Sequence, residues 1–123
     1  MLAASHALAM PASFDQNKLL ERCMGNNALM QKLLMAFLNS LPIEKESLEE
    51  AVQTEDWSSV ARISHKMRGT ALNMCAKPLS EAALQVELAA RANQMDCVAH
   101  RCIDLNQHIE MLMSALTTEA SKA

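Results

Sequence analysis

The segment VAHRCIDLNQHIEMLMSAL, residues 98–116, decides the fold class of this 123-residue chain. Its core-type positions recur at spacings of three and four residues: Val98, Cys102, Leu105, Ile109, Leu112 and Leu116. An α-helix returns a side chain to the same direction about every 3.6 residues, so these six positions form one apolar stripe. Such a stripe is buried against other helices, and the segment therefore predicts a bundle helix from about Asp96 to about Thr118.

The composition of the whole chain favours helices. Half of the residues are hydrophobic but only 2% are aromatic, and the chain has ten methionines, two glycines and three prolines. Leu, Ala and Met are good helix formers, whereas the β-branched and aromatic residues on which sheets depend are scarce. The length suits one compact domain with a real core.

Two helices are predicted near the start of the chain. Asp15 can cap a short helix through Arg22, which the turn at Gly25 would stop. A long helix follows over residues 27–53, because its apolar stripe keeps its phase across Pro42: Met30, Leu34, Phe37, Leu41, Leu48 and Val52. We expect one helix that is kinked at the proline.

Two more helices complete the pattern. Asp56 caps a helix from Trp57 to about Met74, and Pro78 opens another helix that reaches about Ala92. The connections between the four long helices are short, which favours antiparallel neighbours. The sequence thus predicts an all-α, up-down-up-down four-helix bundle with a short additional N-terminal helix.

The domain boundaries follow from these elements. We expect residues 1–13 to be a flexible tail or linker, residues 14–119 to form the bundle, and residues 120–123 to be a C-terminal tail. The first thirteen residues lack a basic region, so they do not fit a signal peptide.

Charge and cysteine content exclude several classes of protein. Eleven Lys and Arg against 14 Asp and Glu give a formal charge of -3, and the few aromatic residues offer no stacking platform, so we expect no nucleic-acid binding. No apolar run approaches the ~18 residues of a membrane span. The four cysteines (Cys23, Cys75, Cys97 and Cys102) form no C-x-x-C pair, and buried free thiols in a reducing cytoplasm fit best. An acidic stretch over residues 44–56 is predicted to be the solvated face of its helix and the following loop.

Gly69 is the unusual residue of the chain, because it lies deep inside a predicted helix, where glycine costs roughly 1 kcal/mol relative to alanine. The core stripe of that helix is Trp57, Val60, Ser64, Met67, Ala71 and Met74. At about 100° per residue, His65 points away from this stripe and Gly69 follows one turn later on the same side. An exposed imidazole therefore lies beside a bare patch of backbone.

The surroundings of His65 suit a phosphoryl group. Arg62, Lys66 and Arg68 supply positive charge, and Ala61 and Leu72 supply a small apolar rim. An imidazole nitrogen can attack phosphorus, and neighbouring cations can offset the phosphoryl oxygens. The alternative is a helical protein-interaction module without phosphotransfer, in which His65 has no chemical role.

A metal site is the weaker alternative. Cys97, His100, Asp104 and His108 share one stripe of the last predicted helix. Four ligands along about 16 Å of straight helix cannot reach one ion at ~2.0–2.3 Å, so a solvated boundary stripe is the better interpretation and no metal is expected.

The run HKMRGTA, residues 65–71, resembles the motif of histidine-containing phosphotransfer (HPt) domains of bacterial phosphorelays. That motif reads His, any residue, a hydrophobe, usually Lys, Gly and then small residues. The likeness covers about residues 14–116 and includes Phe14-Asp15, Gly25-Asn26, Glu55-Asp56-Trp57, Met74, Ala76, Leu79 and Val86-Glu87. One departure is visible: Cys75 and Ala76 stand where many members have Gly, which puts the local helix ending in doubt.

The resemblance implies a role for each matching residue. His65 would carry the phosphoryl group on Nε2, Arg68 would steady its oxygens in place of the usual Lys, and Gly69 would give clearance. Glu87 would hydrogen-bond the other imidazole nitrogen, as in some members, or would be an ordinary surface acid.

The resemblance also implies partners and mechanism. The protein would be a phosphocarrier rather than an enzyme, taking the phosphoryl group from a receiver-domain aspartate, or a kinase, and passing it to a response-regulator aspartate. Mg²⁺ would belong to the receiver, with no cofactor of its own. The docking patch would comprise Ala61, Arg62, Lys66, Leu72, Leu84 and Leu88. We expect a cytoplasmic monomer, either free-standing or as the cytoplasmic domain of a membrane-bound hybrid kinase.

Overall fold

The structure, a computed structural model, describes the backbone of residues 14–121 and the side chains of residues 14–118. Over this range the chain forms five α-helices and no β-strand. They are α2 (Gln16–Arg22), α3 (Asn27–Gln53), α4 (Trp57–Asn73), α5 (Lys77–Arg91) and α6 (Met95–Ser121). The all-α prediction is confirmed, and the helix ends agree within one residue except at the end of α6.

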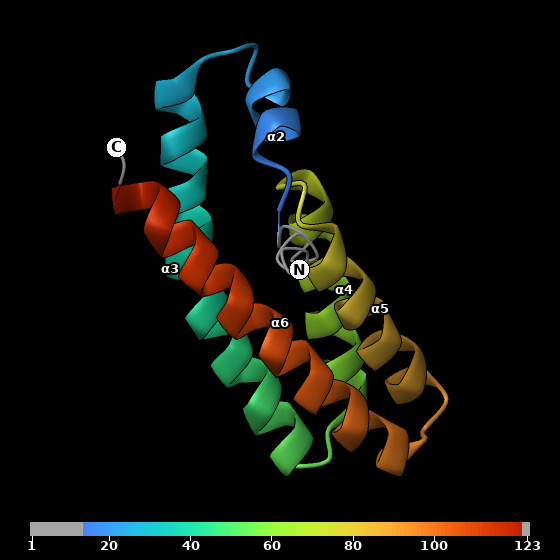
Figure 1. The fold of residues 1–123 in the computed structure, drawn as a ribbon. Coiled ribbons are helices and arrows are strands. Elements are labelled where there is room, and N and C mark those ends of the chain that lie inside the picture. Colours follow the sequence, from blue (N-terminus) through green and yellow to red (C-terminus); the bar gives the residue numbers. More distant parts are fainter. Residues whose placement is uncertain (1–13, 122–123) are drawn as a thin grey trace, which may run out of the picture.

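The four long helices form a closed ring in which each contacts two neighbours, in the order α3, α4, α5, α6 and back to α3. Successive helices run in opposite directions, as the short connections predict (Figure 1). The helices α3 and α6 have 27 residues each, about 40 Å, whereas α4 and α5 have 17 and 15. The short helix α2 packs against α3 beyond the end of α4 and α5, where the longer helices would otherwise lack a neighbour (Figure 1).

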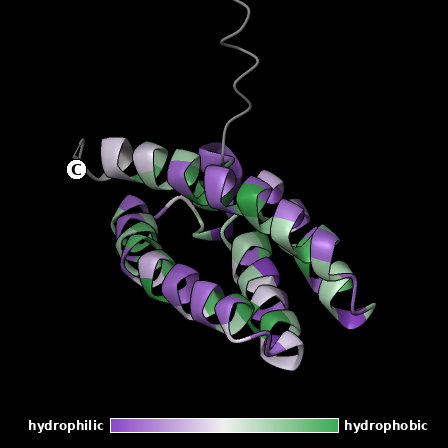
Figure 2. Ribbon diagram, turned by 90° about the horizontal axis from the view of Figure 1, so that it is seen from below, coloured by the Kyte–Doolittle hydropathy of each residue, from purple (hydrophilic) through white to green (hydrophobic). Residues whose placement is uncertain are grey.

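The predicted stripes form the core. Apolar segments face the inside of the bundle and polar segments face outward (Figure 2). Fifteen of the eighteen positions in the three stripes are buried, and the other three (Val52, Trp57 and Cys102) are half-buried. Val52 and Cys102 line a hollow of about 390 Å³ between α3 and α6, which explains their partial exposure.

The ends of the first four helices share one motif. Each has a non-glycine residue in the left-handed conformation, with φ between 55° and 59°: Met24, Glu55, Cys75 and Asn93. The following amide then donates to a carbonyl five residues back, at 2.8–3.0 Å, which closes a Schellman cap. Cys75 thus adopts the conformation that a glycine would favour, and α4 ends normally despite the departure from the HPt pattern.

Some sequence predictions need correction. The helix α3 runs through Pro42, as predicted, and the kink there stays a prediction. The helix α6 continues to Ser121, into the predicted C-terminal tail, while the predictions for residues 1–13 lie outside the described residues. Within residues 14–121, no helix has the length and apolarity that a membrane span requires.

The four cysteines are free, as predicted, but not all are buried. Cys23 is buried, Cys75 and Cys102 are half-buried, and Cys97 is exposed because it precedes the stripe of α6 by one position. Burial, with a smaller contribution from Glu49, raises the pKa of Cys102 to about 11. The Cys102 thiol is therefore protonated and unreactive at neutral pH.

Candidate functional site

His65 lies on the outer face of α4, in the middle of the helix. Asp56 caps this helix by accepting hydrogen bonds from the Ser59 amide at 3.2 Å and the Ser59 hydroxyl at 2.6 Å. Both bonds lower the pKa of Asp56 below its usual value, and the bond from the hydroxyl has the larger effect. The buried stripe of α4 faces the core, so the His65 side chain points outward and is 61% exposed.

Ser64, which precedes His65, has no catalytic arrangement. It is buried, and its hydroxyl donates to the carbonyl of Val60 at 2.7 Å and lies 3.2 Å from that of Ala61. A serine whose hydroxyl is directed into its own helix cannot act as a nucleophile on a docked substrate. The chemistry of this face therefore rests on the imidazole.

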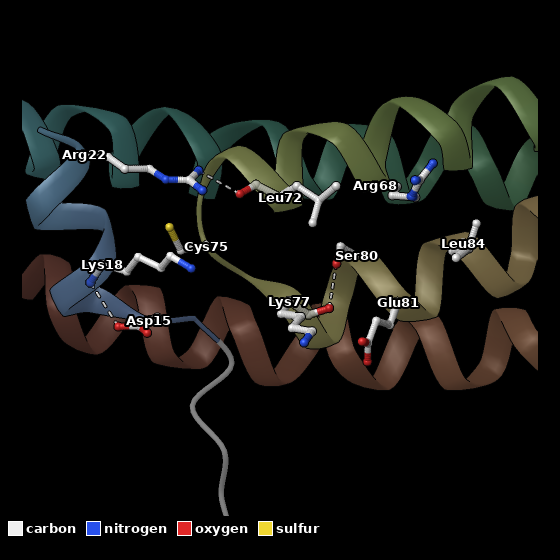
Figure 3. Close-up of a pocket in the computed structure, with 10 residues that line it drawn as sticks. All are labelled: Asp15, Lys18, Arg22, Arg68, Leu72, Cys75, Lys77, Ser80, Glu81 and Leu84. Atoms are coloured by element: carbon white, nitrogen blue, oxygen red, sulfur yellow. Dashed lines mark hydrogen bonds between the residues drawn. The ribbon is translucent and has the colours of Figure 1, made fainter.

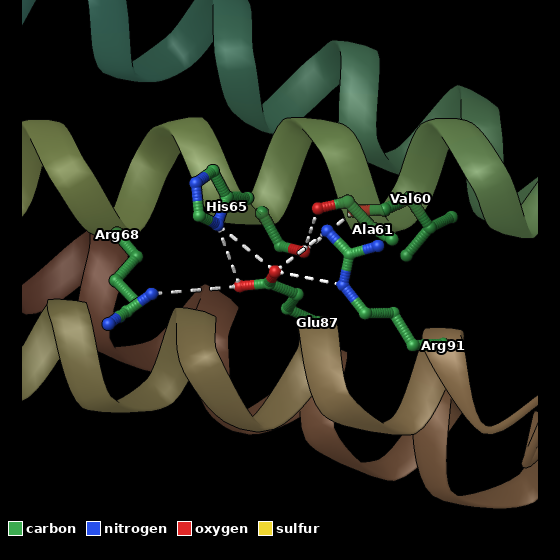
Figure 4. Close-up of polar contacts among 7 residues, drawn as sticks. Val60, Ala61, His65, Arg68, Glu87 and Arg91 are labelled. Atoms are coloured by element: carbon green, nitrogen blue, oxygen red, sulfur yellow. Dashed lines mark hydrogen bonds and ion pairs between the residues drawn. The ribbon is translucent and has the colours of Figure 1, made fainter.

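Glu87 of α5 holds the inner edge of the imidazole ring. Its carboxylate oxygens lie 3.0 Å (Oε2) and 3.2 Å (Oε1) from His65 Nδ1 (Figure 4). The Glu87 side chain is only 8% exposed. The alternative of an ordinary surface acid is therefore wrong.

Two arginines accompany the buried carboxylate. Arg91, one turn along α5, donates to Glu87 Oε2 from Nε at 3.0 Å, and its Nη2 lies 2.9 Å from the same oxygen. Arg68 Nη1 lies 3.9 Å from Oε1 (Figure 4). A buried carboxylate needs such partners, because an uncompensated charge away from water is very unfavourable.

This geometry selects one form of the neutral imidazole. An ionised carboxylate only accepts hydrogen bonds, so Nδ1 must carry the proton that faces Glu87. The lone pair of the neutral ring then resides on Nε2, and Figure 4 shows that second ring nitrogen directed away from Glu87. The exposed nitrogen is the nucleophilic one.

Gly69 follows His65 by one helical turn and is surrounded by open space. A Cβ added there would find no heavy atom within 4 Å outside its own stretch of helix, and its φ is not left-handed. Neither packing nor backbone conformation requires a glycine at this position. The remaining physical reason for a glycine here is clearance for a group that approaches His65.

The sequence model of the Hpt domain family matches residues 32–119, well over half of the chain. The chain belongs to the Hpt domain family. This Hpt domain is 28% identical over 83 residues to the virulence sensor protein BvgS of Bordetella bronchiseptica and to that of Bordetella parapertussis. The match covers 68% of this chain but only 7% of either BvgS, so the chain spans a small part of the length of these relatives.

Two solved structures share the fold. The histidine-containing phosphotransfer protein B (HptB) of Pseudomonas aeruginosa PAO1 has a TM-score of 0.84 at 18% identity, covering 92% of this chain and 98% of that one. The HPT domain of a sensor hybrid histidine kinase from Shewanella has a TM-score of 0.79 at 17% identity, covering 90% and 96%. The predicted family, that of HPt domains of phosphorelays, and the predicted bundle architecture are confirmed.

Most of the predicted docking residues are accessible at the surface, with one exception. Arg62, Lys66, Leu72 and Leu88 are exposed, and Leu84 is half-buried. Ala61 is only 4% exposed because it turns toward the core beside Val60, so the prediction that it lines the exposed rim is wrong.

Glu44 is a second correction. The sequence predicts it on the solvated face of its helix, but its side chain is only 14% exposed and faces Lys66 of α4, with 4.0 Å between Nζ and Oε2. Its other oxygen, Oε1, is buried without a hydrogen-bond partner. Burial raises the pKa of Glu44, and the opposing effect of Lys66 is smaller.

The sequence did not predict the role of Arg91 beside Glu87. The only available signal for Arg91 was its spacing of four residues from Glu87 on one helix face. On α6, His108 Nε2 lies 3.8 Å from Asp104, and no group of three or more metal-binding side chains comes together within the described part of the chain.

Proposed function

We propose that His65 receives a phosphoryl group from the aspartyl phosphate of a receiver domain and passes it to the aspartate of a response regulator. The observation that carries this proposal is the contact between His65 Nδ1 and the buried Glu87 carboxylate, which leaves Nε2 free on the exposed side. A surface histidine without a chemical role would need no buried carboxylate behind it.

The transfer balances without any other acid or base. The Nε2 lone pair attacks phosphorus, an N–P bond forms, and the P–O bond to the aspartate breaks with its electrons leaving on the carboxylate. The proton stays on Nδ1, so the phosphorylated ring carries a positive charge next to Glu87. The carboxylate stabilises that charge, and Arg91 holds the carboxylate in place as a positioning residue. The onward transfer is the same step in reverse on a second aspartate.

The remaining groups act on the phosphoryl oxygens and on the partner. Arg68, whose Nη1 lies 3.9 Å from Glu87 Oε1, steadies the oxygens, and Gly69 leaves them room. Mg²⁺ is supplied by the receiver domain, and the protein carries no cofactor of its own. Leu72, Leu84 and Leu88 form the apolar part of the docking surface, rimmed by cations. In this role the protein acts as a monomer in the cytoplasm.

Phosphotransfer to His65 provides the test. Receiver domains labelled with phosphate are mixed with the protein, and acid-labile, alkali-stable label is measured over time. We expect label on the wild-type protein, none on His65→Gln, and undiminished label on His100→Gln, a matched exposed histidine on α6. Label that persists in His65→Gln would refute the site, and no label on wild-type protein from any receiver would favour a helical interaction module.

A further inference from the structure

A pocket of about 340 Å³ opens next to the His65 face, between α2, α4 and α5 (Figure 3). Three of its lining residues, Arg68, Leu72 and Leu84, already belong to the proposed site and docking surface. The pocket therefore continues that surface toward α2 and the turn at Cys75.

The pocket walls are fixed by hydrogen bonds that join the two ends of α2 to the C-terminal end of α4 and its following turn. The amide of Asp15 donates to the carbonyl of Cys75 at 2.8 Å. Arg22 donates through Nη1 to the carbonyls of Leu72 and Asn73 at 3.1 and 3.2 Å. The short helix α2 is thus held against α4 at both of its ends, and the pocket is part of the folded domain.

The lining is rich in cations, and two of them, Lys18 and Lys77, have no partner in the described part of the fold. Four Lys and Arg side chains face two carboxylates, Asp15 and Glu81. Asp15 is occupied as the cap of α2, accepting from the Lys18 amide at 3.0 Å. The side-chain amines of Lys18 and Lys77 make no hydrogen bond or ion pair within residues 14–118. In Figure 3 the Lys18 side chain extends from α2 toward the turn that carries Cys75.

Both lysines also lie where they disfavour their own helices. Lys18 is in the first turn of α2, and Lys77 is the first residue of α5. The helix dipole makes a helix N-terminus unfavourable for positive charge, and Lys18 is also four residues from another cation, Arg22. Neither lysine gains a partner inside the described domain that would offset this. An anionic group of a bound partner would offset this unfavourable charge.

We propose that this pocket receives a carboxylate side chain of the docked receiver domain, held by Lys18 and Lys77. The inference deepens the function proposed above and rests on it. A partner that carries its phosphoryl group on an aspartate and binds Mg²⁺ must present carboxylates around its active site. The mixed lining fits such a side chain, since Leu72 and Leu84 contact its carbon stem and the amines contact its charged end. The pocket adds a charge-selective contact beside the apolar patch.

The test changes charge without weakening the fold. The double variant Lys18→Glu/Lys77→Gln replaces both cations with residues that helix N-termini accept, and Glu at position 18 can pair with Arg22. We expect its thermal unfolding midpoint to equal or exceed that of wild-type protein. Lys32→Glu/Arg101→Gln is the matched control, because it makes the same charge change at exposed positions of α3 and α6.

The measured quantity is kcat/KM for transfer from the phosphorylated receiver domain that labels the wild-type protein most rapidly. We expect the pocket variant to lower it about tenfold, with weaker salt dependence, and the control to lower it less than twofold. Labelling of His65 by phosphoramidate, a small donor that needs no docking, should be unchanged in both variants.

Each contrary outcome has a distinct meaning. Equal rates for the pocket variant and the control would overturn the proposal, as would a matching loss with phosphoramidate, because the effect would then lie at His65. If the wild-type protein and the pocket variant both take phosphate from the receiver domain at the normal rate, the pocket proposal is wrong but the phosphotransfer function stands. Wild-type protein that takes no label from any receiver overturns the phosphotransfer function, and the pocket proposal falls with it.

Discussion

The helices α3 and α6 differ sharply from the α2, α4 and α5 side of the bundle. Together α3 and α6 carry three Lys and Arg against eight Asp and Glu, whereas α2, α4 and α5 carry seven of the eleven cations and only three acids. The first group buries regular stripes and pairs Lys45 with Glu49 at 3.2 Å along one helix face. The second group contains a glycine inside a helix, a buried carboxylate and cations at helix N-termini.

The comparison teaches that features which disfavour folding gather near His65, although α3 has two of its own, Pro42 within the helix and the unpaired Oε1 of Glu44. Gly69 weakens α4, Glu87 is charged and buried, and Lys77 opposes the dipole of α5. None of these improves packing, and all lie on the side of the bundle that holds His65. The buried residues of all four long helices supply the stability that allows them.

The largest expected effect is on stability, and it tests whether α6 supports the fold without taking part in phosphotransfer. Leu105→Ala on α6 removes a fully buried side chain and should lower the free energy of unfolding by about 2–5 kcal/mol. Phosphotransfer per folded molecule should stay normal. Urea denaturation followed by circular dichroism measures the first quantity, and Ile103→Ala, an exposed position on the same helix, is the control. A transfer defect in folded Leu105→Ala protein would contradict this expectation.

The next effect tests the functional side. Gly69→Gln should raise helix stability by roughly 0.5–1 kcal/mol, because open space surrounds the position. The same side chain should obstruct the approach to His65 and slow phosphotransfer about a hundredfold, since small misplacements of reacting groups are costly. Ser114→Gln, at an exposed position of α6, is the control. Transfer at the normal rate would refute the role of Gly69 in clearance.

The smallest effect compares the buried carboxylate of Glu87 with the half-buried carboxylate of Glu44. Glu87 has His65 and Arg91 as partners, so Glu87→Gln should destabilise the fold and slow transfer. Glu44 has one distant lysine and an unpaired oxygen, so Glu44→Gln should stabilise the fold at pH 7. In denaturation experiments at pH 7, the free energy of unfolding should fall for Glu87→Gln and rise for Glu44→Gln. A change in the same direction for both variants would contradict the comparison.

The pH dependence gives the Glu44 prediction a second readout. A carboxyl whose pKa is raised on folding contributes stability at low pH, and that contribution is lost as pH rises through the folded-state pKa. The advantage of Glu44→Gln over wild-type protein should therefore disappear below the ordinary carboxyl value of 4.5. Parallel denaturation curves at pH 4 and pH 7 measure it.

Much of this fold could be predicted from periodicity, because long apolar stripes such as that of α6 specify a helix and its buried face together. His65 and Gly69 could be predicted as an exposed pair for the same reason. Ala61 and Glu44 could not, since each lies at the border of a stripe, where a small rotation of the helix decides burial. Arg91 became visible only with the crossing of α4 and α5, which brings Glu87 between the two helices.

Trp57 gives the domain a built-in optical probe. It is the only tryptophan, the chain has no tyrosine, and the indole is half-buried in the first turn of α4. His65 follows eight residues later on the same helix, about 12 Å along its axis. Tryptophan fluorescence therefore comes from this one residue. Its emission wavelength and intensity report on the surroundings of the helix that carries His65, without an attached dye.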